Sequence, residues 1–453
     1  MFKPTNLVIC LAVLLAGCSD NHSALNRDKS AGIKSTITPS KHNGGISLQD
    51  DFAALVVDEG VGKGARHLVV RDNGDIYVKL QKLNNGQGII ALRDNDGDGH
   101  IDQKLGFTDF IGTGIDIYGD YLYASSPKEV YRYALKDDDF IPSGKKELLI
   151  TGFPEQHDHW SKPFTFDDRD NIYVTIGSPS NACQQTARSP GSPGIDPCPQ
   201  RELQSGIWQF SATRLGQIHG QEGQVYGVGI RNAVALDWNH QLQQLHAVPH
   251  GRDQLDTLWP EYFTAEQNAQ LPAEEFIAIK QGDDFGWPYC YFDQFQHKKM
   301  LAPEYGGDGK QQGRCATKAN PIEAFPGHLA PNDLLFYQGE QFPERYKNGA
   351  FIAFHGSWNR APLAQAGYKV VFVPFKDGKP SGDWEVFADG FTGGDHVYNP
   401  GDAKHRPMGL AEGPDGSLYI SDSVKGKIWR VMYYGKGSYT YEKKAKAKPA
   451  PKR

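Results

Sequence analysis

Five short strings hold most of the side chains that could do chemistry. They are Asp158-His159, Arg231-Asn232, His250 to Asp253, His355 to Arg360 and Lys404 to Arg406. A histidine has an ordinary pKa near neutrality, so it can accept a proton from a hydroxyl group at physiological pH. Arginine and lysine can stabilise a developing oxyanion and bind carboxylates. Together these residue types indicate proton removal beside a bound, negatively charged group.

The same local pattern recurs along the chain, and each string lies next to one copy of it. A short apolar strand, a polar turn and a second strand are typical of a β-hairpin. The copies span residues 67–78, 115–123, 164–175, 233–246, 333–337 with 350–354, and 410–420. Their spacing of about 45 to 70 residues fits blades of four strands. The sequence therefore predicts an all-β domain over residues 46–436, a six-bladed β-propeller of four-stranded antiparallel blades whose loops on one face converge on the axis.

Residues 255–332 interrupt this repetition. They contain two cysteines and little clean strand pattern, and only 260–273 has a plausible short helical stretch. We expect a loop-rich insertion over one face, either as a roof over a binding site or as a structural belt.

The strings also support a family resemblance. With Gly282 to Tyr289 (GDDFGWPY) and His355 to Arg360 (HGSWNR), they are similar to the glucose/sorbosone dehydrogenase family over residues 60–435. The best-known members of that family are soluble enzymes that use pyrroloquinoline quinone (PQQ). The resemblance implies a PQQ-dependent dehydrogenase that oxidises a sugar, an aldose-like aldehyde or a polyol. Electrons would pass to a separate acceptor in the cell envelope, such as a cytochrome or a quinone.

The resemblance also assigns catalytic roles to residues of this chain. His159 matches the general base, with Asp158 beside it, although His157 is a competing candidate. Arg231 and Asn232 match an Arg-Asn pair that contacts the quinone carbonyls, and an arginine there would stabilise the developing oxyanion.

Cofactor and metal ligands follow in the same way. The resemblance places Trp358, Arg360, Lys404 and Arg406 at the cofactor, with the three cations against its carboxylates. The main-chain carbonyls of Gly251 and Arg252 match those that hold calcium beside the quinone. Arg252 replaces a proline of the glucose dehydrogenases, so its side chain must point away from the metal. Arg360 and Lys404 also differ from the residue types of the glucose enzymes.

A second calcium site is predicted in an acidic loop. Asp94, Asp96, Asp98 and Asp102, with Gly99 among them, follow the start of an EF-hand calcium loop. The twelfth position is Leu105 and not glutamate, so the loop is either a weak or structural calcium site or simply an acidic turn.

The N-terminus predicts export. Residues 1–17 have a basic start, an apolar run and the small-residue spacing of a lipoprotein signal peptide, and Cys18 would receive the lipid. An ordinary secretory signal is the alternative. Ser19 follows Cys18, which favours the periplasmic face of the outer membrane. Residues 18–45 are polar and predict a flexible tether, and the basic residues 437–453 predict a disordered tail.

Four cysteines remain in the exported part. In an oxidising compartment they suggest two disulfides, and the pairs Cys183–Cys198 and Cys290–Cys315 would close short loops. The sequence alone permits three connectivities. A four-thiolate metal site is the rival, but no C-x-x-C spacing occurs.

Charge and missing motifs exclude several classes of function. The formal net charge is −6, and the basic tail accounts for part of the positive charge, so the folded body is acidic and nucleic acid is not expected as a partner. No dinucleotide, haem-attachment or Walker motif occurs. The alternative to an enzyme is a non-catalytic propeller that binds carbohydrate or an envelope protein, since propellers host many functions. A lactonase-type hydrolase is less favoured, because it would need a carboxylate and asparagine cluster around a metal.

Overall fold

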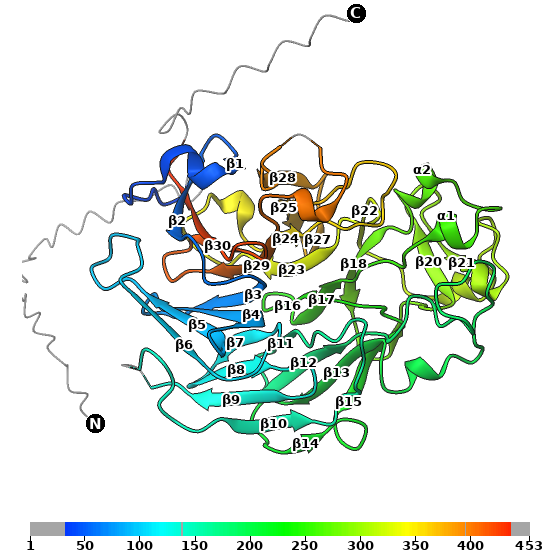
Figure 1. Cartoon of the computed structure of the whole chain (residues 1–453), viewed down its shortest axis with the longest axis horizontal. Coiled ribbons are helices and arrows are strands. Elements are labelled where there is room, and N and C mark those ends of the chain that lie inside the picture. Colours follow the sequence, from blue (N-terminus) through cyan, green and yellow to red (C-terminus); the bar gives the residue numbers. More distant parts are fainter. Residues whose placement is uncertain (1–31, 137–138, 395, 436–453) are drawn as a thin grey trace, which may run out of the picture.

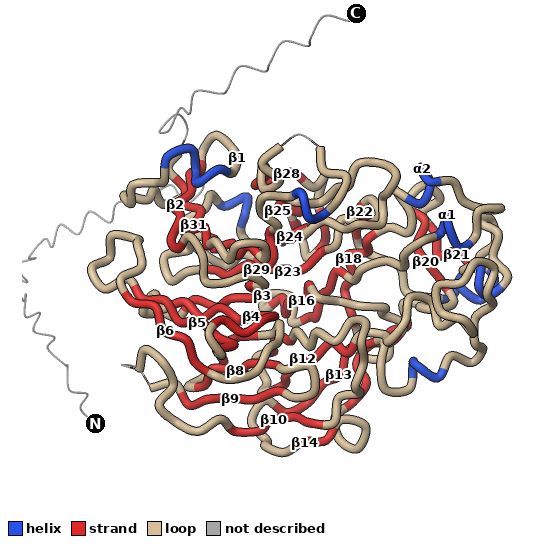
Figure 2. The backbone as a smooth tube through the Cα atoms, in the orientation of Figure 1, coloured by secondary structure: helices blue, strands red, loops and turns tan. Residues whose placement is uncertain are grey.

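The computed structural model describes residues 32–136, 139–394 and 396–435, and these form an almost purely β structure (Figure 2). The predicted signal peptide, Cys18 and the whole predicted basic tail, residues 437–453, lie outside the described residues. Two one-turn helices, α1 (Leu255–Leu258) and α2 (Ala265–Asn268), occur at or near the predicted helical stretch. Within the described ranges, no helix is long and apolar enough to cross a bilayer.

Six antiparallel sheets radiate from a common axis (Figure 1), which confirms the predicted six-bladed propeller. From the axis outward, the first three blades are β3 (Ala65–Val70), β4 (Ile76–Asn84), β5 (Gln87–Arg93) and β6 (Gln103–Phe107); β7 (Ile115–Tyr118), β8 (Tyr121–Ser125), β9 (Val130–Ala134) and β10 (Glu147–Thr151); and β11 (Phe164–Phe166), β12 (Asn171–Ile176), β13 (Gly206–Ser211) and β15 (Gln224–Val228). The next two are β16 (Ala235–Asn239), β17 (Gln244–Val248), β18 (Glu274–Ile279) and β22 (Glu323–Phe325); and β23 (Pro331–Phe336), β24 (Ala350–Phe354), β25 (Lys369–Val373) and β28 (Glu385–Asp389). The sixth is β29 (Pro407–Glu412), β30 (Leu418–Asp422), β31 (Ile428–Tyr433) and β2 (Phe52–Asp58). Short strands β14 (Gln217–Ile218), β19 (Asp283–Asp284) and β1 (Ser47–Leu48) extend the second, third and fifth sheets, while β20 (Cys290–Asp293) with β21 (Lys298–Leu301) and β26 (Phe375–Lys376) with β27 (Lys379–Pro380) form separate hairpins.

Each of the six predicted hairpins forms the two inner strands of one blade. The turns follow from the residues in them. Gly74 has φ +92°, a left-handed conformation that favours glycine. In the third blade, the Asp167 carboxylate accepts hydrogen bonds from the backbone N–H groups of Arg169 and Asn171 and so closes the turn.

The first strand of the domain closes the ring. β2 pairs with β31 in antiparallel register, from Phe52 opposite Tyr433 to Asp58 opposite Ile428. Phe52 packs edge-on against Phe342 and Phe387 of the fifth blade, so the closing strand also belongs to the core between blades.

The predicted tether needs a correction, because its described part is bound to the propeller. The backbone N–H of Ile33 donates to Gln341 O, and that of Ser35 donates to Tyr433 O. Asn43 is buried, and its Oδ1 accepts a hydrogen bond from Ala54 N. Residues 32–45 therefore form part of the folded domain, since their polar groups bind β2, β31 and the Gln341 loop of the fifth blade.

The range 255–332 contains two strands of the fourth blade, β18 and β22. The chain therefore leaves the propeller in two segments, 249–273 and 280–322, which lie together at one edge of the molecule (Figure 1). Both predicted disulfides are present: Cys183–Cys198 closes a loop of the third blade, and Cys290–Cys315 lies in the second segment. The four cysteines pack with Trp287 and Tyr289 of the GDDFGWPY string, so that string is largely structural.

Inner strands leave one edge facing the axis, where no further strand can pair. Aspartates of neighbouring blades bind some of these free N–H groups: Asp237 on β16 accepts from Phe336 N, and Asp333 on β23 accepts from Leu410 N. These two residues and Asp116 on β7 line an axial cavity of about 230 Å³.

Candidate active site

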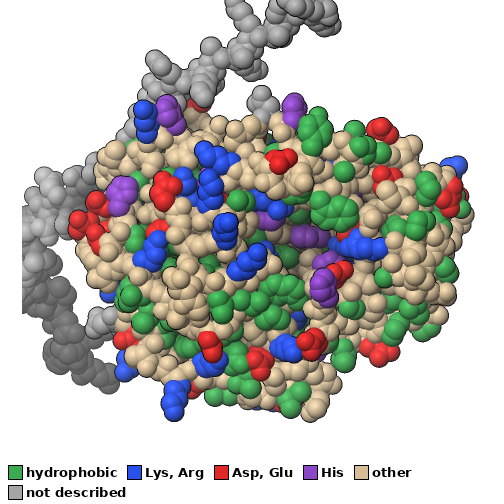
Figure 3. Space-filling view, in the orientation of Figure 1, with side chains coloured by type: hydrophobic (Ala, Val, Ile, Leu, Met, Phe, Trp, Pro, Cys, Tyr) green, Lys and Arg blue, Asp and Glu red, His purple; other side chains and the backbone are tan. Residues whose placement is uncertain are grey.

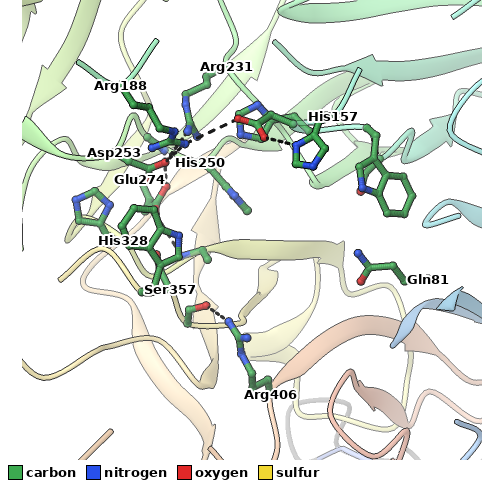
Figure 4. A pocket seen from close by; sticks show the side chains of 18 residues that line it. Gln81, His157, Arg188, Arg231, His250, Asp253, Glu274, His328, Ser357 and Arg406 are labelled. Atoms are coloured by element: carbon green, nitrogen blue, oxygen red, sulfur yellow. Dashed lines mark hydrogen bonds and ion pairs between the residues drawn. The ribbon is translucent and has the colours of Figure 1, made fainter. Parts of the chain in front are cut away.

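A pocket of about 360 Å³ opens near the axis on the face seen in Figure 3, where histidine, lysine and arginine side chains border a central hollow. Its wall comes from loops that precede inner strands and from loops that follow second strands. The residues that line it are Gln81, His157, Asp158, His159, Trp160, Ser161, Arg188, Arg231, His250, Gly251, Asp253, Glu274, His328, Ala330, Gly356, Ser357, Trp358 and Arg406 (Figure 4). The propeller thus brings together residues of five of the six blades, with Gln81 on β4 from the first blade and loop residues from the third to the sixth, as the convergence argument predicts.

His159 presents one free ring nitrogen to this pocket. Its Nδ1 lies 2.7 Å from Ser178 O. A carbonyl oxygen can only accept, so Nδ1 bears the proton and Nε2 keeps its lone pair. Within the described residues, Nε2 has no hydrogen-bond partner. Burial, with a further contribution from the Arg231 guanidinium, lowers the pKa of His159 to about 3, so the imidazole is neutral and able to accept a proton.

Asp158 and His157 lie at the rim. Nδ1 of His157 is 3.1 Å from Asp158 Oδ1, and the His157 side chain is fully exposed. Asp158 Oδ2 lies 4.0 Å from NH2 of Arg188. Of the two competing histidines, His159 is therefore the one held in the wall of the pocket.

Arg231 is buried and clamped along one side. Its Nε donates to Asn181 O at 3.2 Å, and its NH2 donates to Asn181 Oδ1 at 3.1 Å and to Asp253 Oδ2 at 2.8 Å. Among the described residues, NH1 has no hydrogen-bond partner. Burial lowers the pKa of Arg231, and the Asp253 carboxylate opposes that effect. The guanidinium thus remains a cation with one amino group available to a ligand.

Asn232 provides an unsatisfied acceptor next to this arginine. Its side chain is buried, and Oδ1 has no hydrogen-bond partner in the described part of the chain. Its Nδ2 lies 3.5 Å from Nδ1 of His250, which lines the pocket. A buried acceptor without a partner is costly, which favours a ligand at this position.

Of the three cations predicted at cofactor carboxylates, the structure brings only Arg406 into the pocket wall. Arg360 donates to the carbonyl oxygens of Ala269, Gly327 and Ala364, so its guanidinium holds the segment 249–273 in place. Lys404 is exposed, and its side chain lies over Gly393. Other loop carbonyls bind Arg360, and solvent surrounds Lys404, so neither predicted position is reached. Arg406 also donates to loop carbonyls, those of His355 and Gly356, but it stays in the pocket wall. Trp358 lines the pocket with half of its surface exposed.

At the predicted calcium position, Gly251 lines the pocket and its N–H donates to Glu274 Oε2 at 2.9 Å. The Arg252 side chain points away from the pocket and forms a buried ion pair with Glu304. That carboxylate also accepts from Nε1 of Trp259 at 2.9 Å. The two carbonyls expected to bind calcium are thus free of any clash with the cationic side chain of Arg252.

The acidic loop lies apart from the pocket. Carboxylate oxygens of Asp94, Asp96 and Asp102 all lie within 4.8 Å of one another. Asp98 is not part of this cluster, and its Oδ1 accepts a hydrogen bond from His100 N. Leu105 is about half exposed on β6 and supplies no ligand. Three of the four predicted acidic residues are therefore brought together.

Sequence reasoning missed several residues of the pocket. Glu274 is buried at the start of β18, where its oxygens accept from the N–H groups of Gly251 and Ala330, and burial raises its pKa to about 7. Arg188 reaches the pocket from the loop closed by Cys183–Cys198, and no motif in the sequence points to it. Asp253 ends one of the five strings and could have been chosen on that ground.

Comparisons with known proteins agree with this site and fold. The TrAA12-like family model matches residues 46–434, so the chain belongs to the TrAA12-like family. The chain is 28% identical over 333 residues to an uncharacterized protein of Borreliella burgdorferi, and the aligned region covers 71% of this chain and 75% of that protein. It is 26% identical over 360 residues to the pyrroloquinoline quinone-dependent pyranose dehydrogenase of Coprinopsis cinerea, covering 71% of this chain and 46% of the fungal enzyme. The match thus spans less than half of that enzyme's length.

Two solved structures resemble the fold. The PQQ domain of the holo pyranose dehydrogenase of Coprinopsis cinerea has a TM-score of 0.68 at 19% identity, with 88% of this chain and 98% of that domain covered. The calcium structure of the Trichoderma reesei family AA12 protein has a TM-score of 0.70 at 19% identity, with 88% and 99% covered. The expected kinship with PQQ sugar dehydrogenase-like propellers is confirmed.

Proposed function

We propose that this TrAA12-like propeller is a PQQ-dependent dehydrogenase that oxidises a sugar or a related alcohol. The observation that supports it most directly is the pair of free groups in one pocket, Nε2 of His159 and NH1 of Arg231. A base for a hydroxyl proton and a cation for a developing oxyanion are the two groups that such an oxidation requires. The fungal relative is a PQQ-dependent pyranose dehydrogenase.

The residues of the pocket fit the cofactor. Asn232 Oδ1, next to the pocket residue Arg231, is a buried acceptor without a partner among the described residues. NH1 of Arg231 makes no hydrogen bond to these residues and is available to a ligand. Arg406 lines the pocket and would bind a cofactor carboxylate. The exposed ring face of Trp358 would cover an aromatic ligand.

When bound, the quinone would supply the two-electron acceptor. His159 would take the hydroxyl proton of the substrate on Nε2, while Ser178 O keeps the ring in the required tautomer. Arg231 would hold the oxygen that gains negative charge. The low pKa of His159 also means that the accepted proton leaves readily.

Calcium would bind beside the cofactor through the main-chain carbonyls of Gly251 and Arg252. Calcium accepts carbonyl oxygens, and the Arg252 guanidinium is neutralised by Glu304 outside the pocket. A redox acceptor in the envelope, a cytochrome or a quinone, would remove the electrons.

Reconstitution tests the proposal. The purified protein is titrated with PQQ and calcium, and we expect stoichiometric quinone absorbance and dye reduction with at least one sugar of a pyranose panel. Stoichiometric quinone binding without turnover on any sugar would favour a binding propeller, and failure to bind quinone would overturn the enzyme proposal.

We also propose that the chain is exported and anchored through a lipid on Cys18, with the propeller in the periplasm at the outer membrane. The sequence of residues 1–18 supports this location. Labelling with radioactive palmitate is expected to mark the wild type and not C18S. Equal labelling of both would contradict the anchor.

A further inference from the structure

Asp253 binds two arginines through a single carboxylate oxygen. We propose that Asp253 is a positioning residue that holds the Arg231 guanidinium in place in the pocket wall. Arg188 is the second cation bound to the same carboxylate. NH2 of Arg231 lies 2.8 Å, and NH2 of Arg188 lies 3.1 Å, from Oδ2 of Asp253 (Figure 4). The inference rests on the proposed function, because Arg231 is the residue assigned to the developing oxyanion.

The clamp on Arg231 leaves it one orientation. Asn181 accepts from Nε and NH2 through its carbonyl and its side-chain oxygen, and Asp253 accepts from NH2. Asn181 Oδ1 also accepts from Asp253 N at 2.8 Å, and Asn181 Nδ2 donates to Asp253 O at 3.0 Å. The three residues form a closed network, so the guanidinium cannot rotate without breaking several hydrogen bonds. Only NH1 is left for a ligand.

The charge of Asp253 matters as much as its shape. The Arg231 side chain is 5% exposed and that of Asp253 15% exposed, so the two charges interact in a weakly screened environment. Two guanidinium groups share this one carboxylate. Without its charge the two guanidinium groups would repel each other, and Arg231 would lose its ion pair and depend on Asn181 for its position. A neutral replacement of the same shape is therefore not equivalent.

Arg188 connects this network to the other side of the pocket. It is 34% exposed, lies 4.0 Å from Asp158 Oδ2, and donates through NH1 to Gln254 Oε1 at 2.6 Å. Its backbone N–H donates to Gln184 Oε1 at 3.0 Å, within the loop closed by Cys183–Cys198. The segment from Ser178 to Arg188 thus fixes His159 through Ser178 and Arg231 through Asn181.

A double-mutant cycle tests the proposal in the holoenzyme with a pyranose substrate and a dye. We expect D253N to lower kcat about 100-fold, because a small misplacement of a catalytic group has an effect of that order, with KM changed far less. R188Q alone should lower kcat a few-fold. In the D253N background R188Q should instead raise kcat, because it removes the unpaired second cation. The matched control is D196N. Asp196 lies in the same disulfide-closed loop as Arg188 and forms an exposed ion pair with Arg314, so its replacement should leave kcat unchanged.

The cycle has two results that overturn the proposal: a kcat of D253N equal to that of D196N, or a further loss when R188Q is added to D253N. If D253N does not fold, D253E replaces it. This variant keeps the charge but moves the carboxylate oxygen, so we expect a smaller loss of kcat than in D253N. A kcat of D253E equal to that of the wild type would contradict the proposal.

A crystal structure of D253N separates this inference from the proposed function. If the wild type neither binds quinone nor oxidises sugar, the proposed function fails. Displacement of the Arg231 guanidinium from Asn181 in D253N would still support the positioning role, and an unmoved guanidinium would refute it.

Discussion

His159 is the residue whose chemistry can be tested most directly. We expect H159A to lower kcat by about 10²- to 10⁴-fold, the usual contribution of a general base, while quinone binding measured by absorbance stays close to wild type. His157 lies two residues away in the same loop, at the rim of the pocket, with a fully exposed side chain, and provides the control. H157A should retain wild-type turnover, and a loss in H157A equal to that in H159A would move the base.

The same residue predicts an unusual pH dependence. An ordinary histidine base would become protonated below about pH 6.5 and lose activity there. Because burial lowers the pKa of His159 to about 3, it stays neutral down to that region. We expect kcat/KM to show no acid limb from this base between pH 8 and pH 5. Stopped-flow dye reduction across this range measures the profile, and a limb near pH 6.5 that changes in H159Q would contradict the assignment.

At the residue scale, the sequence could predict which loops meet but not where each side chain points. His159, Arg231 and Arg406 face the pocket, whereas Arg360 and Lys404 do not. Loop carbonyls bind both arginines, but those that bind Arg360 belong to Ala269, Gly327 and Ala364, whereas Arg406 donates to His355 O and Gly356 O and stays in the pocket wall. These carbonyls belong to residues far apart in sequence, and no pattern within the string reveals them.

Among the elements, the acidic loop gives a prediction about metal binding. Three carboxylates close together repel each other, and a divalent cation would relieve that repulsion. We expect calcium to raise the Tm of the apo protein by a few degrees, because a ligand that binds only the folded state stabilises it. Scanning calorimetry with and without calcium measures this shift. D94N should lose it and D98N should largely keep it, whereas an equal shift in wild type and D94N would show that this loop is not the site.

Elements differ in how well the sequence predicts them. The inner hairpins could be found because alternating apolar residues and turn residues repeat in each blade. β18 and β22 escaped detection because long excursions separate them from β17 and from each other. The pairing of β2 with β31 could not be predicted either, because strands from opposite ends of the domain leave no local pattern in the sequence.

Across the whole molecule, buried carboxyl groups and buried histidines change the free energy of unfolding in opposite directions as pH rises. Burial raises the pKa of Asp116 and Asp237 on the axis to about 7, so their contribution to stability falls as pH rises from about 4 to about 7. Burial lowers the pKa of His67 and His246 to about 4, so their contribution rises as pH rises from about 4 to about 6.5. The two sets offset each other in the shared range.

Replacing one axial carboxyl group should change how the Tm depends on pH. We expect D116N to have a higher Tm than wild type at pH 8, by about 1–3 °C, and the difference should shrink as pH falls and vanish at about pH 4 and below. In the described part of the chain, Asp116 Oδ1 accepts a hydrogen bond only from the adjacent Ile117 N, so asparagine can keep that hydrogen bond. D120N, at the exposed turn of the same hairpin, is the control. A difference that does not depend on pH would contradict the charge argument.

Ring closure by β2 has a further consequence for how the chain folds. The strand that begins the domain finds its partner only when β31 is available, at the far end of the same domain. Contacts of such high sequence separation form slowly, because loop closure comes before any gain from packing. Until then, both edges of the open ring can pair with other chains. We therefore expect the final docking of β2 to limit the refolding rate, and a circular permutant that joins β31 to β2 in one hairpin to fold faster and aggregate less.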